Sequence, residues 1–185
     1  MPAKETPLFG GYMSTILPQN LTDASNIRQI PDNQEVFLSQ NDQSFIIELM
    51  EYVDKSDEDA IRTHFEDLSE ANDANNPENS KINSIEKIEN SKHSLNGCES
   101  AYYVYGTQMV SKFKEQARNR VDLHLVLFRL PQYLTDILVT FNNPVIVDTQ
   151  SSSFDQATAV STALTKEDFE KITTNLKLLD PALFG

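Results

Sequence analysis

The stretch that decides the fold is "VDLHLVLFRLPQYLTDILVTFNN", residues 121–143. Its first ten residues alternate as a strand does, with apolar side chains on both faces. One face carries Val121, Leu123, Leu125 and Leu127, and the other carries Val126, Phe128 and Leu130. A strand that is apolar on both faces belongs in the middle of a sheet whose two faces are both covered. This stretch therefore predicts a central strand with helices on each side.

The connection after this strand sets the direction of the next one. Only residues 131–134, which include "PQY", lie before a second strand pattern, "TDILVTFNN". A connection this short cannot form the crossover that parallel neighbours need, so the two strands must form an antiparallel hairpin. The sequence therefore predicts an α+β fold with a largely antiparallel sheet packed in a sandwich with helices.

Further strands are predicted where aromatic and β-branched residues cluster between turn signals. These segments are "GYMSTILP" (11–18), "EVFLS" (35–39) and "SAYYVYGTQMVSKF" (100–113). "TDASNIRQ" (22–29) indicates a short turn or a helical turn. "KINSIEKIE" (81–89) fits either a helix or an edge strand, and we favour the strand.

Three helices are expected. "FIIELMEYV" (45–53) has apolar residues at helical spacing and a cap in Asp42 or Ser44. Ser56 begins a second helix, because its hydroxyl and Asp59 approximate a capping box. Thr165 begins a third, whose apolar stripe is Phe169, Ile172, Leu176 and Leu179 and which Asp180-Pro181 ends. The polar segments 72–80 and 145–164 are expected to be loops.

Composition limits the classes of partner. The formal net charge of -13 opposes binding to nucleic acid or to an anionic membrane, since both would be repelled. A basic protein partner fits better, although a solvated helix face explains the same acids more simply. The charge is uneven, because residues 42–70 carry a net -8 and residues 81–120 a net +3. Without an apolar run of about 20 residues or a signal segment, the protein is expected to be soluble and intracellular.

Motifs for catalysis and metal binding are missing from the sequence. The five glycines form no phosphate-binding loop, and no Gly-x-Ser-x-Gly elbow occurs. His64, His93 and His124 have no paired ligand spacing, and His64 and His124 are expected to be packed, hydrogen-bonded rings. "DKSDED" (54–59) fails as a calcium loop for want of its glycine and glutamate. The lone Cys98 is expected to be a half-buried thiol, so we expect no catalytic residue, metal or cofactor.

The segment "IPDNQEV", residues 30–36, is the remaining candidate for a working surface. Pro31, Asp32 and Asn33 are typical of a turn, and Asn33 is explained as well by satisfying local backbone groups. Glu35 stands just before an apolar strand and must face solvent or find a partner. Asp32 and Glu35, with Gln34 between them, are therefore predicted to present two acceptors from one rigid edge.

Longer motifs extend along nearly the whole chain. They are "LFGG" (8–11), "ILP" (16–18), "PDNQEVF" (31–37), "DQSFIIELMEYV" (42–53), "HFEDL" (64–68), "RLPQYLTDILVTFN" (129–142) and "DPALFG" (180–185). With these motifs the chain resembles the Ran guanine nucleotide release factors, the MOG family of nuclear transport. Only the polar loop near 72–80 and the serine-rich segment after Val147 lie outside the resemblance.

The resemblance implies a single domain over residues 1–185, with a six-stranded, mainly antiparallel sheet between helices, similar to the photosystem subunit PsbP. It implies a protein without enzyme chemistry that binds Ran, promotes release of its guanine nucleotide and supports nuclear import. The alternative is a Ran-binding adaptor or chaperone. The expected contact residues are Asp32 and Glu35, with Gln34, Asp23 and Arg28 beside them. We expect a monomer in nucleus and cytoplasm that binds neither nucleic acid nor membrane.

Overall fold

The computed structural model describes residues 2–39, 42–111, 118–146 and 163–185. Its main element is a seven-stranded sheet in which every neighbouring pair is antiparallel. From one edge to the other the strands are β3 (Thr22–Asp23), β4 (Gln34–Leu38), β5 (Ser44–Glu51), β9 (Thr135–Ile146), β8 (Arg118–Leu130), β7 (Ser100–Ser111) and β6 (Ser80–Ile88). The strands predicted at 35–39 and 81–89 are therefore confirmed, and the one predicted at 100–113 is confirmed as far as Ser111, since residues 112 and 113 lie outside the described ranges.

The predicted hairpin lies at the centre of this sheet. β8 and β9 pair antiparallel, with Val126 opposite Val139, and a 3₁₀ turn, η4 (Pro131–Tyr133), joins them. The two apolar faces of β8 divide as the alternation predicts. Val126 and Phe128 belong to one core cluster, and Leu125 and Leu127 belong to the other.

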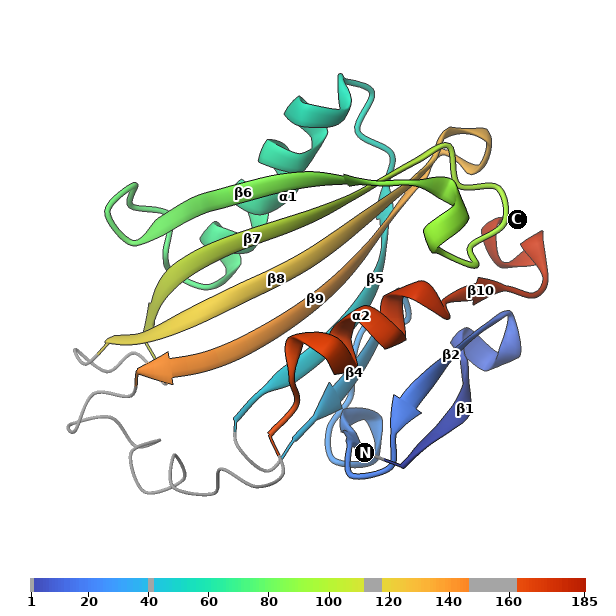
Figure 1. Cartoon of the computed structure of the whole chain (residues 1–185), viewed down its shortest axis with the longest axis horizontal. Coiled ribbons are helices and arrows are strands. Elements are labelled where there is room, and N and C mark those ends of the chain that lie inside the picture. The colour runs from blue at the N-terminus through green and yellow to red at the C-terminus, as the bar shows by residue number, and fades with distance from the viewer. Residues whose placement is uncertain (1, 40–41, 112–117, 147–162) are drawn as a thin grey trace.

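A helix covers each face of the sheet (Figure 1). α1 (Asp57–Ala71) places Ala60 and Ile61 against the Leu125 face, and α2 (Lys166–Thr174) places Phe169 and Ile172 against the other. Ser56 caps α1 and Thr165 caps α2, as predicted, each by accepting a backbone N–H three residues on. The α+β class and the two-sided covering are confirmed.

A second, three-stranded sheet lies on the α2 side. It has the order β1 (Ala3–Leu8), β2 (Met13–Pro18) and β10 (Lys177–Leu178). The Thr15 hydroxyl donates to the Ile172 carbonyl at 2.6 Å, and Met13 and Leu17 share a core cluster with Ile172. This small sheet and α2 thus close the same face of the main sheet together, as Figure 1 shows.

One predicted helix is wrong. Residues 45–53 form β5 and the segment after it, not a helix. The helical spacing was misleading because β5 lies between β4 and β9 and is covered on both sides, so its apolar residues follow no single face. Phe45 and Ile47 are fully buried in one cluster, while Met50 packs on the other.

Three further expectations need correction. The main sheet has seven strands in the described ranges, not six, because the two-residue β3 extends its edge. The third helix ends at Thr174, before β10, and Leu179 is exposed where the stripe predicted burial. The loop predicted at 145–164 lies largely outside the described residues, and β9 extends to Ile146. Among the described residues, no helix is long and apolar enough to cross a membrane.

Candidate functional site

The candidate site begins at the turn before β4. The Gln34 N–H donates to the Pro31 carbonyl at 3.0 Å, which closes the turn predicted for this segment. Asn33 fastens the turn to β5, since its Nδ2 donates to the Leu49 carbonyl at 3.0 Å and its own carbonyl accepts from Leu49 N–H at 2.9 Å. Asn33 is thus architectural, but its side chain bonds to Leu49 on the neighbouring strand and not to the local backbone groups that the turn chemistry suggested. Asp32, between these fixed points, is exposed to solvent.

Glu35 reaches across to the beginning of the chain. Its half-buried carboxylate accepts a hydrogen bond from the Phe9 N–H in η1 (Phe9–Gly11). Phe9, Gly10 and Gly11 all have positive φ, so the chain leaves the extended conformation here and the Phe9 N–H bonds to a side chain instead of to a neighbouring strand. Burial raises the pKa of Glu35, and the bond from Phe9 offsets part of the rise. Glu35 therefore has a partner in the Phe9 N–H and is still partly exposed to solvent.

Asp23 lies near Glu35 from the adjacent strand. Its side chain caps η2 (Ala24–Asn26) by accepting the Ser25 N–H at 2.8 Å. Its negative charge also contributes to the raised pKa of Glu35, because the two carboxylates share one face of the β3–β4 pair. Arg28 is exposed in the segment that leads from η2 to Pro31. The structure thus brings Asp23 and Glu35 together, with Asp32 at the adjoining turn.

Gln34 does not lie beside the two carboxylates. It points to the opposite face of β4, where its Nε2 donates to Glu48 Oε1 at 2.5 Å. Burial raises the pKa of Glu48, and the bond from Gln34 opposes the rise. Gln34 therefore orders the α1 side of the sheet instead of the predicted edge.

An open hollow of about 510 Å³ borders the site where the two sheets meet. Apolar side chains from β2, β4 and the loop between β2 and β3 form its walls, and one charge of each sign lies at its rim. These lining residues include Leu17, Leu21, Phe37, Lys4 and Asp23. Asp23 lines this hollow and also lies near Glu35. The hollow and the two carboxylates therefore form one continuous, partly apolar surface.

A second group of charges is buried and structural. Arg129 donates from Nε to Asp136 Oδ1 at 3.3 Å and from Nη1 to Asp57 Oδ1 at 2.8 Å, and it also donates to the Val53 carbonyl. His64 on α1 lies 2.8 Å from Asp136 through Nε2, which confirms a hydrogen-bonded core histidine. Burial would raise the pKa of Asp57, but bonds from Tyr102 and Arg129 outweigh it and lower that pKa. This network fastens α1 to the central hairpin.

The other candidates for chemistry have structural explanations. His124 is packed among aromatic rings and its Nδ1 lies 2.7 Å from the Tyr103 hydroxyl, as predicted for a packed ring. Burial raises the pKa of the Cys98 thiol to about 11, which keeps it protonated at neutral pH. Within the described part of the chain, no group of three His, Cys, Asp or Glu side chains could hold a metal ion.

Comparison with known proteins assigns the chain to a family. The family model described as "Ran-interacting Mog1 protein" matches residues 6–144, about three quarters of the chain. The chain belongs to the Mog1 family. The Ran guanine nucleotide release factor of Danio rerio is 46% identical over 181 residues, covering 97% of this chain and 98% of that protein. The Ran guanine nucleotide release factor of Homo sapiens is 38% identical over 187 residues, covering 100% and 98%.

Solved structures agree with the Mog1 assignment at the level of fold. The crystal structure of the Saccharomyces cerevisiae Ran-binding protein Mog1p covers 100% of both chains, with a TM-score of 0.72 and 24% identity. The expected likeness to PsbP stays a prediction.

Sequence reasoning missed two features of this Mog1 surface. It did not predict that Glu35 holds the "LFGG" turn, because the partner atom lies 26 residues away. It also gave no role to Leu134 at the tip of the β8–β9 hairpin, which is 74% exposed. The available signal for Leu134 was a large apolar residue inside a turn between two strands.

Proposed function

We propose that this protein binds the small GTPase Ran, promotes release of its guanine nucleotide and supports nuclear protein import. We further propose that residues 1–185 act as one Ran-binding domain, a monomer in nucleus and cytoplasm that contacts neither nucleic acid nor membrane. Its role is that of a regulator of a GTPase, without bond-making chemistry of its own. Membership of the Mog1 family carries this proposal.

The contact is proposed to centre on Asp32 and Glu35. The turn before β4 is fixed to β5 by Asn33, and the carboxylate of Glu35 is fixed by the Phe9 N–H. Rigid acceptors lose little freedom when they bind, so the charge at this edge is arranged before the partner arrives. Asp23 and the exposed Arg28 extend the surface, whereas Gln34 acts behind it by ordering Glu48.

Release of nucleotide requires a preference between two states of Ran. A factor that bound the loaded and empty forms equally would shift no equilibrium, however tightly it bound. Carboxylates can pair with lysines that otherwise support bound phosphate, which offsets the positive charge exposed when the nucleotide leaves. Removing one partner of a desolvated pair costs about 2–5 kcal/mol, against less than about 1 kcal/mol for an exposed pair.

A turnover experiment separates release activity from the adaptor alternative. Ran loaded with a fluorescent guanine nucleotide is mixed with excess unlabelled nucleotide and a substoichiometric amount of this protein in a stopped-flow instrument. A release factor speeds the loss of label from all of the Ran, because each molecule acts repeatedly. An adaptor would bind Ran in a pull-down but leave the release rate unchanged at this ratio, which would contradict the proposal.

A further inference from the structure

Leu134 combines two unfavourable features at one position. Its side chain is 74% exposed, the largest exposed fraction among the large apolar residues that the structure describes. Its backbone is left-handed, with φ 48° and ψ 38°, a conformation that favours glycine or asparagine over a bulky residue. The core gains little from a leucine here and the turn would accept a smaller residue more easily. Stability alone therefore does not explain this side chain.

The tip that carries Leu134 is held firmly. The Leu134 N–H donates to the Pro131 carbonyl at 3.1 Å, and the Leu134 carbonyl accepts from Tyr52 N–H at 3.0 Å. The ring of Tyr133 stacks on Phe184 near the C-terminus, with centroids 4.7 Å apart. The backbone and the neighbouring ring are thus fixed, while the Leu134 side chain points to solvent. A rigid apolar group presented in this way is suited to binding a partner at low entropic cost.

The tip lies at the same end of the sheet as the proposed Ran contact. Tyr52, which bonds to Leu134, follows β5 directly, and Leu49 of β5 pairs with Asn33. β5 separates β4 from β9, and the start of β4 lies opposite Glu48 while the start of β9 lies opposite Glu51. Two strand spacings across and three residues along β5 place these two starts about 14 Å apart. A standard protein interface covers about 800 Å² on each partner, which spans both strand ends. The exposed carboxylates of Asp32 and Glu51 flank this end, and Glu51 pairs with Thr135, beside Leu134.

We propose that Leu134 is an apolar anchor of the Ran-docking surface, inserted into a recess of Ran that is bordered by basic side chains. This inference rests on the proposed function. Ran is the expected occupant because the tip lies at the same end of the sheet as Asp32, and because the exposed carboxylates of Asp32 and Glu51 at this end would face a basic rim. Interfaces commonly place an apolar centre inside a polar, charged rim, and this end of the sheet has that arrangement.

The decisive variant is Leu134→Asn, because asparagine accepts the left-handed backbone and removes the apolar anchor. We expect its melting temperature to equal or exceed that of the wild type. We expect its affinity for nucleotide-free Ran, measured by biolayer interferometry, to fall about tenfold or more. The matched control is Val145→Asn, which removes another exposed apolar residue, 43% exposed, about 35 Å away along β9. The control should bind Ran as the wild type does.

The outcomes separate this inference from the function on which it rests. If Leu134→Asn binds Ran as tightly as the wild type while Asp32→Lys binds weakly, the anchor is wrong and the docking edge stands. If wild-type protein fails to bind Ran in every nucleotide state, the proposed function fails and the anchor with it. A clear drop in the melting temperature of Leu134→Asn would also overturn the inference, since it would reveal a structural role for the leucine.

Discussion

At the scale of single residues, Glu35 combines a structural and a functional role that can be separated. Its carboxylate holds the Phe9 N–H, yet burial raises its pKa, so the negative charge is not what the fold prefers there. A neutral acceptor of the same shape would keep the hydrogen bond without the cost of a half-buried charge. The charge is therefore better explained by a partner than by the fold.

Two substitutions of Glu35 should therefore differ in their effect on stability. Glu35→Gln keeps an oxygen for Phe9 and should leave thermal stability at neutral pH unchanged or higher, while Ran affinity falls. Glu35→Ala leaves the Phe9 donor without its partner. It should lower both thermal stability and Ran affinity, with a stability loss of about 1–3 kcal/mol. Differential scanning calorimetry and a Ran binding assay measure the two properties. Equal Ran affinity for Glu35→Gln and wild type would show that Ran binding does not need the charge.

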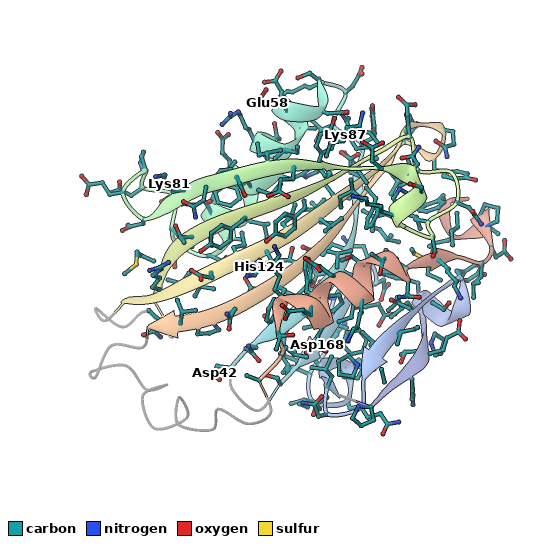
Figure 2. All side chains as sticks on the ribbon, in the orientation of Figure 1. Asp42, Glu58, Lys81, Lys87, His124 and Asp168 are labelled. Atoms are coloured by element: carbon teal, nitrogen blue, oxygen red, sulfur yellow. The ribbon has the colours of Figure 1, made fainter. Side chains whose placement is uncertain are left out.

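His124 predicts a pH dependence of stability. Burial lowers its pKa from the ordinary value of 6.5, with Asp122 and Glu170 opposing the shift and Lys166 adding to it. The unfolded chain therefore takes up this proton at a higher pH than the folded chain, and stability is lost as pH falls below about 6.5. Figure 2 labels His124 on β8, on the face that α2 covers.

The substitution His124→Phe tests this dependence by removing the titrating ring. The melting temperature of the wild type should fall more than that of the variant between about pH 7.5 and pH 5.5. His93, whose pKa is also lowered by burial, leaves a residual slope in both proteins. Parallel curves for the two proteins would contradict the assignment.

At the scale of elements, the buried network around Arg129 holds α1 against the central hairpin. Arg129 and Asp136 are 2% and 0% exposed, so removing the cation leaves a buried carboxylate without its partner. Arg129→Met should cost about 3–5 kcal/mol, read as a lower urea midpoint. Arg62→Met is the matched control, because Arg62 forms an exposed pair with Glu58 on α1 and should leave the midpoint near that of the wild type.

The outcome that would contradict this account is an Arg129→Met protein as stable as the control. The loss should also be smaller in a variant that combines Arg129→Met with Asp136→Asn, since no buried charge is then left alone and the amide oxygen can still accept from the Val53 N–H. A double variant less stable than Arg129→Met would therefore argue against the network as the cause.

How much of the fold could be predicted differs from element to element. The β8–β9 hairpin followed from local pattern and a four-residue connection, because both are encoded in adjacent residues. The strand β5 could not be predicted from local pattern, because a short apolar run that is covered on both faces has no periodicity that distinguishes a strand from a helix. The turn at Pro31–Asn33 was predictable from turn chemistry, whereas the Glu35 bond to Phe9 depends on the docking of the second sheet. The left-handed backbone of Leu134 could not be predicted either, because it depends on the geometry of the hairpin.

At the scale of the whole molecule, the net charge of -13 predicts how fast Ran is captured. An acidic protein attracts a basic docking face over distances comparable with the Debye length, about 8 Å at physiological salt. Raising the salt from about 0.05 M to 0.5 M should lower the association rate constant by roughly tenfold and change dissociation less. Stopped-flow fluorescence at several salt concentrations measures both rates. A salt-independent association rate would show that electrostatic steering plays no part.

The central claim is that Asp32, in the turn before β4, and Glu35 contact Ran. One measurement tests this claim most directly. The rate of labelled-nucleotide release from Ran is followed against the concentration of wild type, Asp32→Lys and the control Asp67→Lys, an equal charge change at an exposed position of α1. We expect Asp32→Lys to need at least about tenfold more protein for half-maximal release, and Asp67→Lys to match the wild type. Equal curves for Asp32→Lys and the wild type, with the fold intact by circular dichroism, would contradict the assignment.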